Sequence, residues 1–527
     1  MPTDSESARP PFDPLALGRR DFLELTGAGA AVLGAALLGG LPLVSGGALA
    51  QAAPKRGGTL KVACPPATGI DPVKMDSSGA IAIVQQVAEY LVWTEPDLTL
   101  RPVLATSWRA EDGGRSWIFE LRRGVKFHDG RDFTADDVVA SFQRLVDPQQ
   151  ASAARAQLGF LRKEYITKID SHTVRFDLDR PIGAFPYYTQ VYNAVILPAD
   201  YKGDFAEKPI GTGPFRMTEF KPQQGAVLVR NETYWDEGRP YLDRVEIQNY
   251  EAQPPMILAL KGGQADMMLL TTFIDGRPLL DDPAIEVIAS PSAEHRQLTM
   301  RTDRKPFDDK RVRQAVALCL DRQALIQGLL GGRAELGNDH PVAPIYPEKV
   351  QLAQRKADLG QARRLLAEAG YPNGIDVELY TAQYQELPQY TALIQQMLAP
   401  AGIRVTPKVE PVNAYYDHWT EVPMGLTDWT SRPTAAQILN VAFKGGAEWN
   451  AAKWRNAEFD TLLESLDAEP DLAKRTEIAG RIAAIMNDEV PAVIAYFTRN
   501  LRPVRKGVNG VPASLSQFLD LTRAWKA

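Results

Sequence analysis

Hydrophobic positions along the chain switch between two spacings, which indicates strands and helices in alternation. Residues 59–63 form a short apolar run that predicts a strand, and apolar residues at helical spacing predict a helix over 81–92. Residues 116–122 alternate apolar and polar side chains, as a strand with one buried face does. The pattern therefore predicts a mixed α/β fold.

A turn and a capped helix follow that third segment. His128 opens a His-Asp-Gly sequence that predicts a turn, and we interpret it as a turn residue and not as a catalyst or a ligand. Thr134 and Asp137 occupy the two positions of a capping box, which satisfies free amide groups at a helix start. Apolar residues at helical spacing then continue to Leu145, so a helix is predicted from Thr134 onward.

The second half of the chain repeats this alternation. Residues 359–369 predict a helix that Gly370 closes, because glycine readily takes the left-handed conformation at a helix end. Residues 459–486 predict two helices broken near Pro470, and residues 493–497 predict a buried strand. Several helices packed on sheets are therefore expected.

Length and composition limit the class of protein. With 527 residues, the chain exceeds the size at which one hydrophobic core stops growing, so two or more lobes are expected. Hydrophobic residues make up 45% and charged residues 24%, which is typical of a folded protein rather than a disordered one. The net charge is -6 and the basic residues are dispersed, so no nucleic-acid partner is expected.

Residues that carry catalytic or metal chemistry do not form recognisable groups. Cys64 and Cys319 are far apart in the sequence, and Cys319 lies in an apolar helical run where it should pack as a small hydrophobic side chain. No HExxH, GxSxG or Walker motif occurs, and the histidines are scattered. We therefore expect no enzyme, no cofactor and no metal site.

The first fifty residues have the order of an export signal. Arg19 and Arg20 precede an apolar stretch over 27–44, and small residues follow at 48–50. The paired arginines resemble a twin-arginine signal, so residues 1–53 are expected to form a cleavable signal of the Tat type, with Sec export as the alternative. A membrane anchor is disfavoured because the stretch is rich in glycine and alanine and contains a proline. A periplasmic location is expected.

Four long segments, in order along the chain, resemble family 5 of the extracellular solute-binding proteins, the dipeptide, oligopeptide and nickel group. The resemblance covers nearly all of residues 57–515. The segments are LATSWRAEDGGRSWIFELRRGVKFHDGRDFTADDVVASFQRL at 104–145, PIGTGPF at 209–215, NETYWDEGRPY at 231–241, and KPFDDKRVRQAVALCLDRQAL at 305–325.

That resemblance implies a two-lobed periplasmic binding protein fold, of type II and similar to cluster C, with an extra subdomain in the first lobe. Two crossing strands would form the hinge, and the lobes would close on a solute. Lobe I is expected to combine residues 54–97, 205–297 and 491–527, the extra subdomain to span 98–204, and lobe II to span 298–490.

The segment from Thr427 to Pro433 is the most informative for ligand binding. In peptide-binding members of the family, a tryptophan near this place is followed by an aspartate that pairs with the peptide's ammonium group, and the matching position here holds Arg432. A guanidinium favours a carboxylate, phosphate or sulfonate instead. The alternative is that Arg432 pairs with a neighbouring acid such as Asp428 and never meets a solute.

Other candidate contacts surround Arg432 or come from the lobe interface. Trp429 could form a flat wall for the ligand, whereas packing is the favoured role for Trp449. A lone histidine at 295 is more often structural than a ligand. Gly211 and Gly213 permit positive φ beside Pro214, so a tight loop is expected there rather than a phosphate-binding loop. The full set of candidate substrate-binding residues is Trp429, Arg432, Thr430, Asp428, Trp449, Asn450, Met75, Ser77, His295 and Arg296.

The resulting prediction is the monomeric substrate-binding component of an ABC importer. It would capture a small peptide or a carboxylate-bearing amino-acid derivative and deliver it to the membrane permease and ATPase subunits. Binding of a sugar or nickel chelate, chemoreceptor docking, and a role as an exported peptide-binding chaperone remain open alternatives.

Overall fold

The computed structural model describes residues 53–513 and 516–527. Pro54–Ala527 forms one compact unit, and all that follows concerns that unit. The export signal predicted for residues 1–53 lies outside the described residues except for its last position. Among the residues described, no helix is both long enough and apolar enough to cross a membrane.

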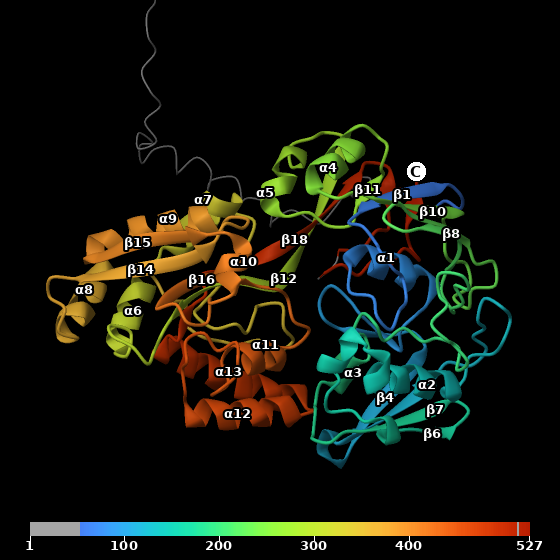
Figure 1. Cartoon of the computed structure of the whole chain (residues 1–527), viewed down its shortest axis with the longest axis horizontal. Coiled ribbons are helices and arrows are strands. Elements are labelled where there is room, and N and C mark those ends of the chain that lie inside the picture. Colours follow the sequence, from blue (N-terminus) through green and yellow to red (C-terminus); the bar gives the residue numbers. More distant parts are fainter. Residues whose placement is uncertain (1–52, 514–515) are drawn as a thin grey trace, which may run out of the picture. The chain divides into compact units, whose positions relative to one another are not determined.

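A long mixed sheet, with β12 (Ile285–Met300) and β18 (Tyr496–Arg505) at its centre, runs through this unit. β12 pairs antiparallel with β18 from Ile285 to Pro291, and from His295 onward it also pairs with β16 (Met424–Trp429). Figure 1 shows β12 and β18 passing between the part that holds β14 to β16 and the part that holds β1 and β10. The other strands of this sheet are β1 (Thr59–Cys64), β8 (Phe215–Lys221), β9 (Gly225–Arg230), β10 (Arg244–Asn249), β11 (Met267–Met268), β13 (Glu335–Leu336), β14 (Ile375–Ala382), β15 (Ile403–Glu410) and β17 (Ala492–Val493).

The segment predicted as the extra subdomain contains a separate antiparallel sheet in the order β4-β5-β7-β6. The capped helix is confirmed: α2 (Ala135–Val146) follows Thr134, whose backbone N–H donates to the Asp137 carboxylate at 2.8 Å. His128 lies in a turn as predicted, and its Nε2 contacts the Gly213 carbonyl oxygen at 3.0 Å. The strands are β4 (Ala105–Glu111), β5 (Ser116–Leu121), β6 (Ile166–Asp170) and β7 (Thr173–Asp177).

The other elements include α-helices of 4 to 18 residues and two small strand pairs. β2 pairs with β3, and β19 pairs with β20. Their bounds, and those of the helices, are α1 (Ser78–Val87), β2 (Val92–Thr94), β3 (Leu100–Pro102), α3 (Phe185–Tyr188), α4 (Gln253–Lys261), α5 (Phe273–Gly276), α6 (Lys310–Leu318), α7 (Arg322–Leu330), α8 (Leu359–Glu368), α9 (Leu387–Leu398), α10 (Val412–Tyr416), α11 (Ala435–Ala442), α12 (Ala457–Ala468), α13 (Leu472–Glu489), β19 (Val508–Asn509) and β20 (Trp525–Lys526).

The helix predicted over 81–92 is displaced in the structure. α1 begins at Ser78 and ends at Val87, because Ala88 is extended and the chain then turns toward β2. That turn directs Glu89 into the interior, where it accepts hydrogen bonds from other buried side chains. The apolar run continues past the helix end because these residues are buried in extended backbone as well, so hydrophobic spacing alone placed the boundary wrongly.

Neither Gly211 nor Gly213 uses the positive φ that glycine permits. A Cβ at Gly211 would lie 2.1 Å from the Val87 carbonyl oxygen, and one at Gly213 would lie 2.7 Å from the same atom. Glycine is needed at both positions because the loop packs directly on the backbone at the end of α1. The reason is close approach and not backbone conformation.

The two helices predicted near the C-terminus are confirmed, and the strand predicted after them is corrected. α12 and α13 are separate helices, and Glu469, which precedes Pro470, is extended, as a residue before proline prefers. The single strand predicted over 493–497 is instead β17 followed by the start of β18. The two residues between β17 and β18 do not pair in the sheet, so the single buried apolar run is divided between two strands.

Buried apolar side chains form separate cores on the two sides of β12 and β18. One core combines residues from β1 to β11 with the four-stranded sheet, and another combines α6 to α9 with β14 to β16. Cys319 belongs to the second core, as predicted for a small hydrophobic side chain. A third core joins α11 to α13 and also includes Leu98 from the segment predicted as the extra subdomain.

Candidate solute-binding site

Arg432 lies between two pockets lined by residues of both predicted lobes. The chain leaves β16 at Trp429, and Arg432 follows three residues later, before the start of α11. The larger space, which we call the aromatic pocket, has a volume of about 640 Å³. It is lined by Ala153, Ala156, Gln157, Gly159, Phe160, Asp179, Arg180, Tyr188, Arg432, Gln437, Asn440, Val441, Trp449 and Asp467.

The second space, which we call the C-terminal pocket, has a volume of about 80 Å³. It brings residues near the end of the chain, in the predicted lobe I, against the loop that carries Arg432. Its lining is Trp93, Thr94, Pro96, Leu98, Tyr187, Gln190, Ser431, Arg432, Pro433, Pro512, Ala513, Ser516 and Phe518. Arg432 is the residue common to the two linings, so its side chain adjoins both spaces.

The guanidinium of Arg432 has no acidic partner among the described residues. Its Nε–H is buried and donates to no partner within residues 53–513 and 516–527, and burial lowers the pKa of the group. Asp428, the alternative partner, instead accepts a hydrogen bond from the Tyr416 hydroxyl group. A cation with unused donors next to open space is arranged to receive an anion.

Two tryptophans contact each other near Arg432, and of the two only Trp449 lines one of its pockets. The ring centroids of Trp429 and Trp449 are 6.1 Å apart, at 60°. Trp429 is buried, and its Nε1 donor has no hydrogen-bond partner in the described part of the chain. Trp449 was expected to pack, yet 44% of it is exposed, and it lines the aromatic pocket. The Trp429 ring is therefore packed in the interior, whereas the Trp449 ring is open to the aromatic pocket.

The pairing of β12 with β16 places the remaining candidate binding residues of these strands on opposite faces of the sheet. His295 pairs with Trp429, and Arg296 pairs with Asp428, so neighbouring residues face opposite sides of the sheet. His295 is fully buried, and this burial lowers its pKa to about 4, so the ring is neutral at physiological pH. Thr430 is exposed just beyond the strand.

Arg296 is buried in a network of its own. Its Nε donates to Glu386 at 2.7 Å, and its Nη1 donates to Glu294 at 3.0 Å. Its Nη2 donates to Gln385 at 2.6 Å. This arginine therefore lies away from the two pockets of Arg432 and has its donors occupied.

Met75, Ser77 and Asn450 do not line the pockets that adjoin Arg432. Met75 is part of the core, and its carbonyl oxygen accepts from Asn193 at 2.9 Å. Ser77 caps the start of α1, where its hydroxyl accepts from the Ala80 N–H at 3.4 Å. Asn450 donates to backbone oxygens, including that of Trp454 at 2.8 Å, so it braces its own turn.

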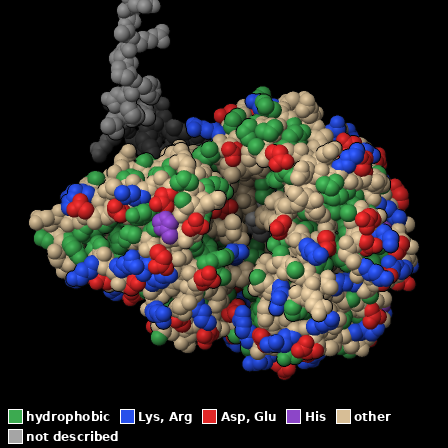
Figure 2. All heavy atoms as spheres, in the orientation of Figure 1, with side chains coloured by type: hydrophobic (Ala, Val, Ile, Leu, Met, Phe, Trp, Pro, Cys, Tyr) green, Lys and Arg blue, Asp and Glu red, His purple; other side chains and the backbone are tan. Residues whose placement is uncertain are grey.

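No sequence motif marks the residues that the segment 153–188 contributes to the aromatic pocket. Arg180 forms an ion pair with Asp467 of α12 and lies 5.7 Å from the centre of the Phe160 ring. The Gly183 N–H donates to the Asp467 carbonyl oxygen at 2.8 Å. These contacts join segments nearly 300 positions apart, and no local motif marks them. In Figure 2 the visible surface is hollowed between the two sides, and acidic and basic side chains are interspersed on it.

Comparison with known proteins places this arrangement in a class. Residues 99–451 match the model of the bacterial extracellular solute-binding proteins, family 5 middle region. The fold is that of the type II periplasmic binding proteins: the structure of HbpA2 from Haemophilus parasuis gives a TM-score of 0.78 at 22% identity, covering 89% of this chain and 100% of that one.

The chain belongs to family 5 of the bacterial extracellular solute-binding proteins, which are substrate-binding components of ABC importers. It is 27% identical over 464 residues to heme-binding protein A of Haemophilus influenzae, covering 81% of this chain and 84% of the relative. It is also 27% identical over 478 residues to the glutathione-binding protein GsiB of Escherichia coli K12, covering 84% and 89%.

Proposed function

We propose that this protein captures a small solute bearing a carboxylate, either a short peptide or an amino-acid derivative, and delivers it to an ABC permease. The observation that carries the proposal is the Arg432 guanidinium, which lies between two interlobe pockets with no acidic partner among the described residues. A guanidinium binds a carboxylate through two parallel N–H donors. The relative whose name specifies glutathione, a short peptide with carboxylates, agrees with this class of ligand.

The aromatic pocket supplies the rest of the recognition. Its volume of about 640 Å³ falls in the range of small-molecule sites, about 300–1,000 Å³. Trp449 and Tyr188 offer apolar faces to a solute in this pocket. Because the lining comes from segments 153–188 and 432–467, a solute in it contacts both predicted lobes. Its binding energy then favours the closed arrangement.

The domain boundaries and the export route remain part of the proposal. Lobe I comprises 54–97, 205–297 and 491–527, with the subdomain at 98–204, and lobe II comprises 298–490. Residues 1–53 direct export by the Tat route to the periplasm. Enclosure and release of the solute require no catalytic group, so the role is transport and not catalysis.

The test is a binding panel on the mature protein after refolding without co-purified solute. Short peptides, anionic amino-acid derivatives, sugars and nickel chelates are compared by thermal shift and calorimetry. At about 100 times the dissociation constant, a bound solute adds roughly 2.7 kcal/mol of stability. Wild type is expected to respond to carboxylate-bearing compounds, and Arg432→Ala is expected to lose that response.

Arg404→Ala is the matched control, because Arg404 is exposed and pairs with Asp376 away from the pockets. Solute-free Arg432→Ala should melt at or slightly above the wild-type temperature, since it removes a partly buried cation that has no counter-charge. Binding of carboxylates by Arg432→Ala with wild-type affinity would refute the role of Arg432. Stabilisation of wild type by sugars alone would refute the ligand class.

A further inference from the structure

Among the described residues that line the aromatic pocket, Trp449 is the aromatic side chain most open to its space. It is 44% exposed, whereas Phe160 and Tyr188 are buried. The rings of Phe160 and Tyr188 meet edge to face with their centroids 5.0 Å apart, and the guanidinium of Arg180 lies over the Phe160 ring at 5.7 Å. The protein itself therefore covers most of these two rings, and the Trp449 indole is the main aromatic surface that a solute in this pocket meets.

The turn that carries Trp449 is firmly held. The Gly445 N–H donates to the Asp460 carboxylate of α12 at 2.9 Å. Asn450 is buried and donates to the Trp454 carbonyl oxygen at 2.8 Å, and the Trp454 N–H donates back to the Asn450 Oδ1 at 3.3 Å. Because the backbone on both sides is fixed, the indole loses little freedom when a ligand packs on it.

The contact with Trp429 positions the Trp449 ring without covering it. The two ring planes are tilted at 60° with their centroids 6.1 Å apart, so the rings are not stacked face to face. Trp449 is the most exposed of the nine tryptophans, all of which lie in the described part of the chain. A large apolar surface left open in a concave site is typical of a binding surface.

We propose that the captured solute carries a planar aromatic ring that packs on Trp449, and that Trp449 selects such solutes. Aromatic pairs gain energy beyond the apolar area that they bury, and a saturated group does not obtain this gain. Arg432 lines the same pocket, so a ring and a carboxylate of one molecule would occupy one space. The inference rests on the proposed function in taking these two groups to belong to the same solute.

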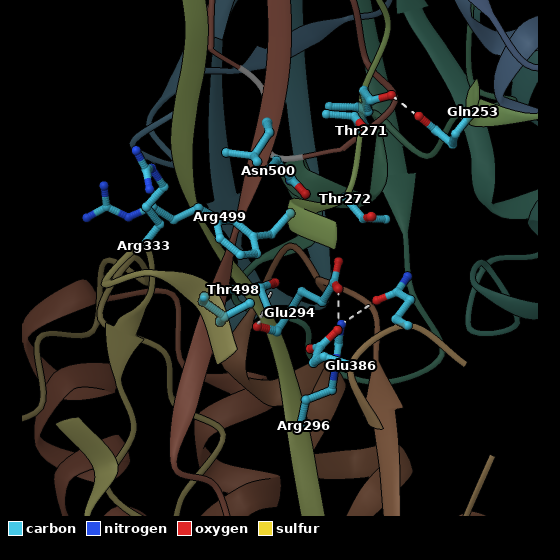
Figure 3. A pocket seen from close by; sticks show the side chains of 15 residues that line it. Gln253, Thr271, Thr272, Glu294, Arg296, Arg333, Glu386, Thr498, Arg499 and Asn500 are labelled. Atoms are coloured by element: carbon cyan, nitrogen blue, oxygen red, sulfur yellow. Dashed lines mark hydrogen bonds and ion pairs between the residues drawn. The ribbon is translucent and has the colours of Figure 1, made fainter. Parts of the chain in front are cut away.

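The pocket at β12 and β18 offers no comparable surface. It has a volume of about 190 Å³, and Figure 3 shows that charged side chains in it are held by one another. Arg296 donates to Glu386 at 2.7 Å and to Glu294 at 3.0 Å, and the aromatic residue of this lining, Phe273, packs against the second core. A ring placed there would separate these charges from their partners, which is costly. The aromatic pocket is therefore the site for the ring.

The test compares alanyl-phenylalanine with alanyl-cyclohexylalanine. These peptides carry the same charges and differ in whether the six-membered ring is aromatic and flat. Calorimetry gives their affinities for wild type, Trp449→Leu and Trp449→Phe. Tyr384→Leu is the control, because Tyr384 is 39% exposed and lines neither pocket that adjoins Arg432. The melting temperature of each solute-free variant shows whether it is folded.

Wild type is expected to bind alanyl-phenylalanine about two- to tenfold more tightly than the cyclohexyl peptide. Hydrophobic burial alone predicts the opposite order, because the saturated ring is the more apolar one. Trp449→Leu should lose the preference, while Trp449→Phe and Tyr384→Leu should keep it. Equal affinity of wild type for the two peptides, a preference for the cyclohexyl ring, or a preference that persists in folded Trp449→Leu would overturn the proposal.

Benzyl alcohol and cyclohexylmethanol separate this inference from the proposed function, because neither has a carboxylate. Saturation-transfer NMR follows their binding to wild type and to Trp449→Leu. If neither peptide binds wild type, the proposed function fails for these solutes. Saturable binding of benzyl alcohol that exceeds that of cyclohexylmethanol and is absent from Trp449→Leu would then still support the ring site, and no binding of benzyl alcohol would overturn it. Binding of both peptides through Arg432 with no preference for the aromatic ring would leave the carboxylate site standing and overturn the ring site.

Discussion

Gly183→Ala tests the contact between the predicted subdomain and lobe II. A Cβ at this position would lie 1.9 Å from the Glu469 carbonyl oxygen and 2.7 Å from the Pro470 nitrogen. Both obstacles are backbone atoms and cannot rotate away, so the two segments must separate. That separation breaks the 2.8 Å hydrogen bond from the Gly183 N–H to the Asp467 carbonyl oxygen and weakens the Arg180–Asp467 ion pair.

The expected loss can be worked out from these two interactions. A backbone hydrogen bond contributes about 1 kcal/mol. The ion pair contributes at most about 1 kcal/mol, because the Arg180 side chain is 50% exposed and solvent screens its charge. The contact is therefore weakened by about 2 kcal/mol, roughly a thirtyfold change in the population that holds the two segments together. A solute that needs this arrangement should bind up to about thirtyfold more weakly.

Small-angle X-ray scattering of the solute-free protein and calorimetric titration with a bound solute provide the measurements. Gly183→Ala should increase the radius of gyration and raise the dissociation constant, while far-ultraviolet circular dichroism remains as in wild type. Gly69→Ala is the control, since a Cβ there would have no atom within 4 Å. An unchanged radius of gyration together with unchanged affinity in folded Gly183→Ala would show that this contact does not hold the lobes together.

Two further predictions concern stability. Asp339 is fully buried and accepts hydrogen bonds from Arg322 at 2.7 and 2.8 Å and from Arg355 at 2.7 Å. Asp339→Asn should therefore lower the free energy of unfolding, measured by denaturant titration, by about 3–5 kcal/mol. Asp376→Asn, which removes the acid of an exposed ion pair with Arg404, should change it by less than about 1 kcal/mol. Equal effects would contradict the role assigned to burial. Glu89 is fully buried, and desolvation raises its pKa to about 7, despite hydrogen bonds from Tyr234, Trp235 and Thr212 and with Asp520 adding to the rise. Because the pKa of Glu89 is higher in the folded state, the free energy of unfolding of wild type should fall by up to about 3 kcal/mol relative to Glu89→Gln as pH rises from about 4.5 to 7, and should then level off. A difference between the two proteins that stays constant across this pH range would refute the prediction.

Local sequence rules located those elements whose boundaries depend on nearby residues. The capping box at Thr134, the proline break at 470 and the glycine after α8 involve contacts within a few positions, so propensity and spacing were sufficient. The end of α1 could not be predicted in this way. It depends on Glu89 meeting Thr212, Tyr234 and Trp235, which are over 120 positions away.

A candidate for the site could be named only where a motif marked it. Arg432 stands out because it replaces an acid in a familiar segment, and it lines two pockets, while its role in binding stays a prediction. Arg180 and Asp467 carry no such mark, since each is an ordinary charged residue on its own segment. Met75 and Ser77 precede α1 as expected, but their side chains are used for packing and capping. The position of a residue along the chain predicts which element it lies near, but it does not predict where its side chain points.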